Sequence, residues 1–150
     1  MSEVPVTISG QLALVSAALF TGAAFYINWA EQPARRKLDD KAQLEHWKPA
    51  YQRGFAMQAP LALIGFFFAA VTWMHGANWL WLAGGLILLA NWPYTLLVIM
   101  PVNTVLEATK AGEAGPQSRL HIARWGQLHG FRTFLGALAT LLLLIASCLH

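Results

Sequence analysis

The segment from Phe55 to Met74, FAMQAPLALIGFFFAAVTWM, contains twenty residues and not one charged side chain. A helix of about 20 apolar residues is long enough to cross the hydrocarbon core of a bilayer. The apolar residues also lack the period-two alternation that is typical of membrane β-strands. The segment therefore predicts a transmembrane helix.

Three other segments have the same character, and together they decide the class of fold. Only 11% of the 150 residues are charged and 57% are hydrophobic, whereas soluble domains carry about 25% charged residues. The sequence predicts an all-α, integral membrane four-helix bundle that forms a single domain over residues 1–150. We expect the membrane spans at about residues 8–30, 55–75, 78–101 and 129–149.

The basic residues predict the orientation in the membrane. All ten lie between spans one and two, between spans three and four, or at the mouth of span four, at positions 35, 36, 37, 41, 48, 53, 110, 119, 124 and 132. The positive-inside rule then places both long loops in the cytoplasm and both termini on the non-cytoplasmic side, in a bacterial inner membrane. No basic residue precedes the first span, so we expect this span to be retained and not cleaved as a signal peptide.

The two long loops are not purely polar. Residues 34–52 and 118–128 alternate charged and apolar positions, which is typical of helices that lie in the lipid headgroup layer. We therefore expect an amphipathic interfacial helix in each cytoplasmic loop.

Several polar side chains fall within the cytoplasmic half of the predicted spans. A polar group without a partner in hydrocarbon costs several kcal/mol, so such side chains face one another or a cavity. We predict a substrate pocket at this depth, with binding residues Tyr26, Glu31, Gln58, Tyr94, Thr95 and Trp125 and catalytic residues Asn103, His129 and Arg132.

Trp125, His129 and Arg132 follow one another at i, i+4 and i+7. This spacing places them on one face of a helix, where an indole, an imidazole and a guanidinium could form one wall of the pocket. The alternative is an interfacial aromatic belt with an arginine that extends to the headgroups.

The stretch NWPYTLLVIMPVN, residues 91–103, carries two prolines inside a predicted span. Each proline removes a backbone donor and frees a carbonyl, which opens the helix locally. We expect Asn103 to satisfy such a freed carbonyl and the prolines to shape a cavity wall. The alternative is a packing kink without a ligand.

Three motifs resemble those of the small integral-membrane anthrone oxygenase family: EQPAR at 31–35, PYTLLVIMPVN at 93–103 and RWGQLHGFR at 124–132. The resemblance also includes a first span that contains glycine. It implies a four-helix membrane bundle and, from fungal relatives, the oxidation of an anthrone to an anthraquinone by O₂. It points to Asn103, Trp125, His129 and Arg132 as site residues, and further to Glu31 and Arg35.

The function favoured is a membrane oxygenase that acts on a flat, lipid-soluble anthrone-, phenol- or quinone-like substrate. His129 would be the base, because the unperturbed pKa of imidazole is about 6.5, and Arg132 and Asn103 would stabilise an oxyanion. Trp125 would stack on the ring. Dioxygen would be the co-substrate, no metal is required, and the sequence identifies no other cofactor.

Two other classes of function remain open at this point. One is a haem- or metal-binding redox protein, although the histidines at 46, 75, 121, 129 and 150 form no compact ligand motif and Cys148 is the sole cysteine. The other is a non-catalytic accessory subunit of a membrane complex. As partners we expect membrane lipids and a hydrophobic aromatic molecule, and no nucleic acid, and the sequence leaves homo-oligomerisation open.

Overall fold

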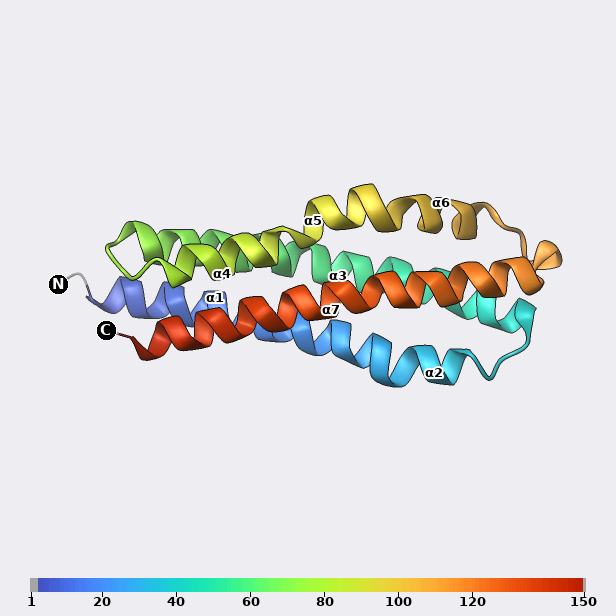
Figure 1. Cartoon of the computed structure of the whole chain (residues 1–150), viewed down its shortest axis with the longest axis horizontal. Helices are drawn as coiled ribbons and strands as arrows, with labels where there is room; N and C mark the ends of the chain where they lie inside the picture. The colour runs from blue at the N-terminus through green and yellow to red at the C-terminus, as the bar shows by residue number, and fades with distance from the viewer. Residues whose placement is uncertain (1–2, 150) are drawn as a thin grey trace.

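The computed structural model of the chain contains four long helical runs that lie side by side (Figure 1). It describes the backbone of residues 3–149 and the side chains of residues 8–149. Within that part the structure has helices and connecting turns but no strand. The first run is α1 (Glu3–Tyr26), η1 (Ile27–Glu31) and α2 (Gln32–Arg35), and the second is α3 (Asp40–Met74). The third is α4 (Leu80–Leu89), α5 (Asn91–Tyr94), η2 (Thr95–Ile99) and α6 (Met100–Ala108), and after η3 (Ala111–Glu113) the fourth is α7 (Pro116–Cys148).

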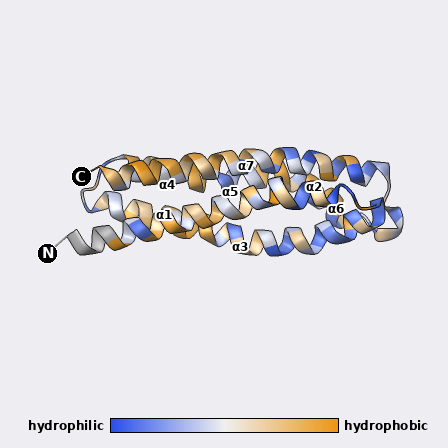
Figure 2. Ribbon diagram, turned by 90° about the horizontal axis from the view of Figure 1, so that it is seen from below, coloured by the Kyte–Doolittle hydropathy of each residue, from blue (hydrophilic) through white to orange (hydrophobic). Residues whose placement is uncertain are grey.

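All four runs are long and apolar enough to cross a membrane. Apolar residues dominate the end of the bundle that holds the α3–α4 turn and the end of α7. Polar residues gather at the opposite end, beside the other two connections (Figure 2). The chain is therefore a multi-pass integral membrane protein, in agreement with the fold class predicted from the sequence.

The expected amphipathic loop helices are not separate elements in the structure. The first run continues through Pro33 to Arg35, so the expected helix over residues 34–52 does not begin there as a separate element. The next helix begins only after Asp39, whose Oδ1 accepts a hydrogen bond from the backbone nitrogen of Ala42 at 2.9 Å, as an N-terminal cap does. From there α3 continues without a break to Met74. Residues 118–128 likewise belong to the continuous helix α7.

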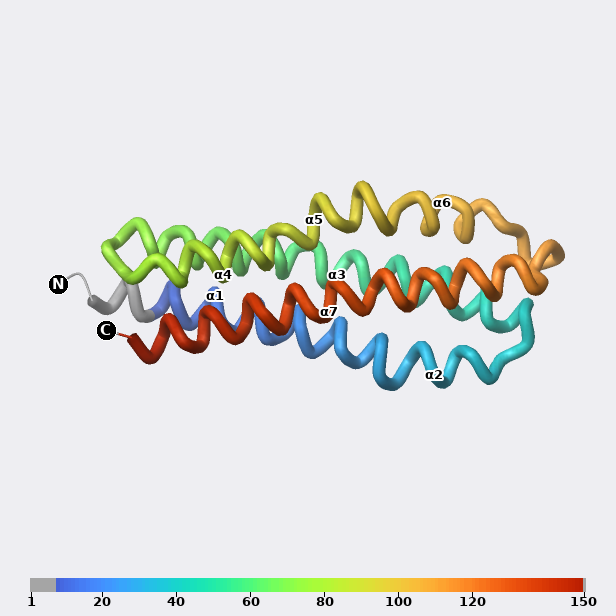
Figure 3. The backbone as a smooth tube through the Cα atoms, viewed as in Figure 1, coloured from blue at the N-terminus to red at the C-terminus, as the bar shows by residue number. Residues whose placement is uncertain are grey.

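Two π-helical segments interrupt the first and third runs. Each segment ends two residues before a proline, η1 before Pro33 and η2 before Pro101. A proline cannot donate to the carbonyl four residues earlier, and in both cases that carbonyl belongs to the central residue of the segment, Trp29 or Leu97. The missing donor explains why the helix widens there. The backbone also steps sideways between α4 and α5, just before Pro93 (Figure 3).

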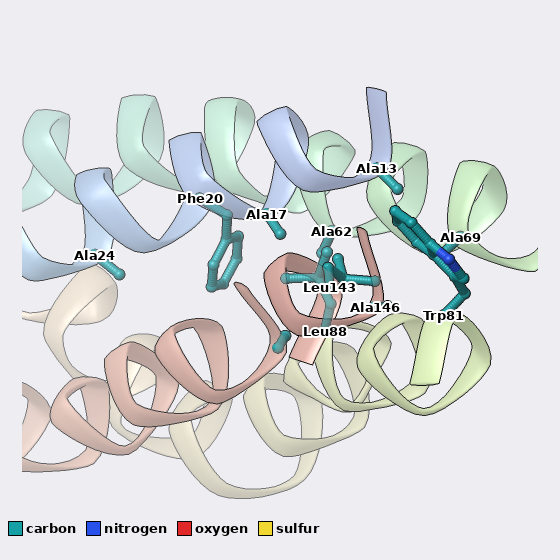
Figure 4. Packing of buried hydrophobic residues seen from close by; sticks show 11 residues of the cluster. Ala13, Ala17, Phe20, Ala24, Ala62, Ala69, Trp81, Leu88, Leu143 and Ala146 are labelled. Carbon is teal, nitrogen blue, oxygen red and sulfur yellow. The ribbon is translucent and has the colours of Figure 1, made fainter. Parts of the chain in front are cut away.

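Small residues allow the helices to pack closely in the apolar half. The core there contains Ala13, Ala17, Ala62 and Ala69 around larger side chains such as Phe20 (Figure 4). A Cβ atom on Gly136 would lie only 2.9 Å from Cδ1 of Phe20, so α7 approaches α1 as closely as it does because this residue is glycine. A second core at the polar end holds Leu44, Trp47, Ile99, Leu106, Ile122 and Trp125.

Candidate functional site

A small cavity lies where the four helical runs meet in the polar half of the bundle. The first run contributes η1, the second α3, the third η2 and α6, and the fourth α7. The cavity has a volume of about 10 Å³, which is roughly the space that one water molecule needs. We call it the first cavity. Its walls are Ile27, Glu31, Ala50, Tyr51, Gly54, Phe55, Gln58, Ile99, Asn103, Trp125, His129 and Arg132.

His129 is 1% exposed and has one nitrogen fixed by a hydrogen bond. Its Nδ1 lies 2.8 Å from Oδ1 of Asn28, and the Thr133 hydroxyl donates to the same oxygen at 2.8 Å. The amide of Asn28 has a defined orientation because its Nδ2 donates to the carbonyl of Gly126, which can only accept. Nδ1 must therefore carry the proton, and Nε2 keeps the lone pair that can accept one.

Arg132 is a buried cation without an acidic partner in the part of the chain that the structure describes. It is 8% exposed, and its Nη2 donates to Oε1 of Gln58 at 3.1 Å. Its guanidinium lies over the ring of Phe20 at 5.4 Å, and its Nε has no hydrogen-bond partner among the described residues. The two ion pairs of the described chain are Arg35–Glu31 and Arg119–Asp40. A charge that is buried without a partner is costly, so the site favours a ligand that brings negative charge to Arg132.

Aromatic rings line the cavity on the side of α3 and α7. The ring centroid of Trp125 lies 4.9 Å from that of His129 and 5.8 Å from that of Trp47. The planes of the two indole rings are nearly perpendicular. Trp47 in turn stacks on Tyr51 at 4.9 Å. Because Trp125 already packs against rings and against the Arg35 guanidinium at 5.8 Å, it forms a rigid wall and not a free stacking surface.

Six of the nine predicted site residues line the first cavity: Glu31, Gln58, Asn103, Trp125, His129 and Arg132. Thr95 lines a neighbouring cavity, which it shares with Arg132. Tyr94 lies near the site without lining either of these two cavities, and its hydroxyl donates to the carbonyl of Leu128 at 2.9 Å. Tyr26 is 61% exposed on the outside of the bundle.

Asn103 has a different role from the one that its position after Pro101 suggests. Its Nδ2 donates to Sδ of Met100 at 4.0 Å, and not to a backbone carbonyl freed by a proline as expected. Its Oδ1 is buried without a hydrogen-bond partner among the described residues. The helix accommodates the proline by forming the π segment, so the Asn103 amide remains in the cavity wall.

Sequence reasoning missed Tyr51 as a lining residue and Asn28 as the partner of His129. Tyr51 lies on the same stripe of α3 as Gln58, seven residues away, so the helical spacing from Gln58 could have found it. Asn28 lies near the end of the first predicted span, where a polar residue is common. No signal in the sequence shows that it contacts a residue 101 positions later.

No three His, Cys, Asp or Glu side chains come together as a candidate metal site in the part of the chain that the structure describes. Arg35 and Glu31 instead pair with each other beside the first cavity. Arg35 also donates to Gln32 and to Nδ1 of His46. This cluster holds the end of the first run against α3.

A model of the anthrone oxygenase family matches residues 47–142, well over half of the chain. The chain belongs to the anthrone oxygenase family. This finding confirms the resemblance drawn from the three motifs. No curated protein matched the chain, and no solved structure did.

The part that matches the anthrone oxygenase family runs from Trp47 in α3 to Leu142 in α7. It includes Tyr51, Gln58, Asn103, Trp125, His129 and Arg132, and it leaves out the Glu31–Arg35 pair and Asn28. Family membership and the four apolar helices together make this a membrane oxygenase-like protein.

Proposed function

We propose that this protein oxidises a flat, lipid-soluble anthrone- or phenol-like substrate with O₂ in the first cavity, near the cytoplasmic face. One observation carries the proposal. A histidine with a free basic nitrogen and a buried arginine without an acidic partner line the same cavity. A base next to an unpaired cation is the arrangement that the formation of an enolate requires.

The first step is the removal of a benzylic proton. Nε2 of His129 accepts a proton from the methylene carbon of the substrate, and the electron pair left behind spreads to the carbonyl oxygen. The resulting enolate oxygen is stabilised by the Arg132 guanidinium and by the Asn103 amide. Both groups are held in place before the charge develops, which is how preorganised donors lower a barrier.

The second step is the reaction of the carbanion with O₂. A carbon–oxygen bond forms, and the peroxide oxygen takes the proton back from the His129 imidazolium. His129 then removes the second proton from the same carbon while the oxygen–oxygen bond breaks. The carbon becomes a carbonyl, and the leaving hydroxide takes the second proton from the His129 imidazolium to give water. One O₂ and one methylene therefore yield one carbonyl and one water, and His129 ends as it began.

A tricyclic substrate requires the first cavity to expand. In this structure it has room for about one water molecule. The third run is the element most suited to move, because it is broken before α5 and widened at η2. Movement of a segment that gates a site is common in enzymes.

The test is oxygen uptake and anthraquinone formation by the purified protein in lipid nanodiscs supplied with anthrone. Empty nanodiscs give the rate of spontaneous oxidation. We expect His129→Gln to lower turnover at least about 100-fold, the size of effect that a general base contributes, while anthrone affinity changes only a few-fold. Arg132→Lys keeps the charge but loses the planar fork, so it should weaken both turnover and affinity. A His129→Gln protein with wild-type turnover would exclude this function.

A further inference from the structure

A second cavity lies beside the first, and Arg132 forms part of both walls. Its other walls are Phe20, Phe55, Ala59, Ala62, Asn91, Trp92, Thr95 and Leu96. Most of these side chains are apolar, and Leu96 is 50% exposed on the outer surface of the bundle. The second cavity thus lies between the buried guanidinium and the side of the bundle that faces lipid. Its volume is about 10 Å³, so it must expand, like the first cavity, to hold a ring.

Asn91 is a polar side chain in this largely apolar wall. It is 2% exposed, and its Nδ2 donates to the carbonyl of Leu88 at 3.0 Å. A carbonyl can only accept, so this bond fixes the orientation of the amide. Oδ1 is then the atom left for the cavity, and it is buried with no hydrogen-bond partner among the described residues.

An unsatisfied buried acceptor costs free energy unless a ligand supplies a donor. The Trp92 indole cannot do so, because its Nε1 donates to the carbonyl of Ala59 at 3.1 Å. We propose that the second cavity is a subsite for a ring of the substrate, and that Asn91 accepts a hydrogen bond from a hydroxyl group on that ring. Asn91 is then a specificity residue: it selects substrates that carry a phenolic donor.

This subsite extends the proposed function, because Arg132 would hold the carbonyl oxygen of the ligand whose ring hydroxyl reaches Asn91. A site built to bond a hydroxyl discriminates strongly against an analogue that lacks it, because the polar group of the protein is then left unpaired. The preference is a difference between two binding affinities, so it can be measured without turnover.

The experiment compares the binding of 2-naphthol and 2-methoxynaphthalene by calorimetry on the purified protein in one detergent. The ether keeps the oxygen and the ring but has no donor. We expect the wild type to prefer 2-naphthol, and Asn91→Leu to reduce the ratio of the two affinities about tenfold, as the loss of one buried hydrogen bond does. A ratio within one protein also cancels any general loss of folded material.

Gln43→Leu is the matched control. Gln43 is 1% exposed with an Oε1 that has no hydrogen-bond partner among the described residues, like Oδ1 of Asn91, but it lines neither of the two cavities. We expect this variant to keep the naphthol preference. Ala59→Phe, which narrows the second cavity, should weaken both probes in parallel. If Asn91→Leu keeps the preference, or if Gln43→Leu loses it equally, the subsite is overturned, and a water molecule would then be the partner of Asn91.

The outcome is separable from that of the oxygenase proposal. If anthrone is not oxidised but Asn91→Leu removes the naphthol preference, the subsite is supported and the oxygenase proposal is wrong. If His129 controls turnover but Asn91→Leu has no effect on the preference, the subsite alone is wrong.

Discussion

At the scale of single residues, the hydrogen bonds of Asn28 determine what His129 can do. The amide oxygen of Asn28 accepts hydrogen bonds from the His129 ring and from the Thr133 hydroxyl, and its amide nitrogen donates to the carbonyl of Gly126. This arrangement sets the tautomer before any substrate arrives. Asn28 is a positioning residue, because it acts through the imidazole and does not line the first cavity.

We predict that Asn28→Leu lowers kcat for anthrone about tenfold or more and leaves KM within a few-fold. Without the acceptor, the imidazole is free to place its proton on Nε2, which then cannot act as the base. Thr133→Val is the control, because it removes the other bond to the same oxygen and should cost less. The measurement is steady-state oxygen uptake. Equal losses in the two variants would contradict the tautomer explanation.

We also predict that Arg132→Met abolishes turnover but raises the thermal unfolding temperature. Methionine keeps an unbranched apolar stem and removes a buried charge that no described carboxylate balances. Replacing buried charge with apolar volume is often stabilising, and residues placed for function often cost stability. Unfolding in detergent, followed by tryptophan fluorescence, tests the stability. A destabilised Arg132→Met protein would mean that the guanidinium supports the fold.

Residue spacing predicted correctly that three of these side chains share one wall of the first cavity, and the reason is physical. Trp125, His129 and Arg132 lie on one uninterrupted helix, α7, where the period of 3.6 holds. Tyr26 and Tyr94 lie at the edges of π segments, where the period changes. The direction of their side chains therefore could not be derived from helical spacing.

At the scale of elements, the apolar composition of four segments predicted the number and class of the long helical runs. The composition did not predict that each long helix continues into its loop. Charged residues at one end of a long helix look the same in the sequence as those of a separate interfacial helix. Asp39 was the available signal for the true start of α3, since a capping aspartate commonly precedes a helix. The prediction of an opening at Pro101 agrees with the π segment, but the corresponding effect of Pro33 was missed.

We predict that Pro101→Ala stabilises the protein and reduces its turnover. Alanine restores the backbone N–H that the Leu97 carbonyl lacks and favours a regular helix through η2. The side chains of Ile99 and Asn103, which line the first cavity, would then shift. Pro116→Ala is the control, because Pro116 is in the first turn of α7, where the missing N–H is not needed. Thermal unfolding and oxygen uptake measure the two effects.

At the scale of the whole molecule, the bundle is longer than a bilayer is thick. The 35 residues of α3 extend about 50 Å at 1.5 Å per residue, against a hydrocarbon core of about 30 Å. The surplus falls at the polar end of the bundle (Figure 2). There Lys48 holds the end of α6 through the carbonyls of Glu107 and Thr109. Arg119 ties α7 to Asp40 and to the carbonyls of Arg36 and Leu38.

We predict that this polar end faces the cytoplasm. In a Cys148→Ser background, a membrane-impermeant maleimide applied to intact bacteria should label His75→Cys and spare Gly112→Cys. Both positions are exposed in short connections. Permeabilised cells should label both variants, which controls for reactivity. Labelling of Gly112→Cys alone in intact cells would reverse the orientation.

The two π segments also have a consequence for chain length. A π turn arises when one extra residue enters an α-helix, so removing one residue from Thr95–Ile99 leaves both flanks in phase. The same deletion within α7 would rotate everything beyond it by about 100°. We therefore expect deletions in this chain to be tolerated best beside its proposed active site. A version one residue shorter in each of the two segments would fold as an ordinary bundle of regular helices. The two extra residues of this chain therefore serve the cavity and not the folding of the bundle.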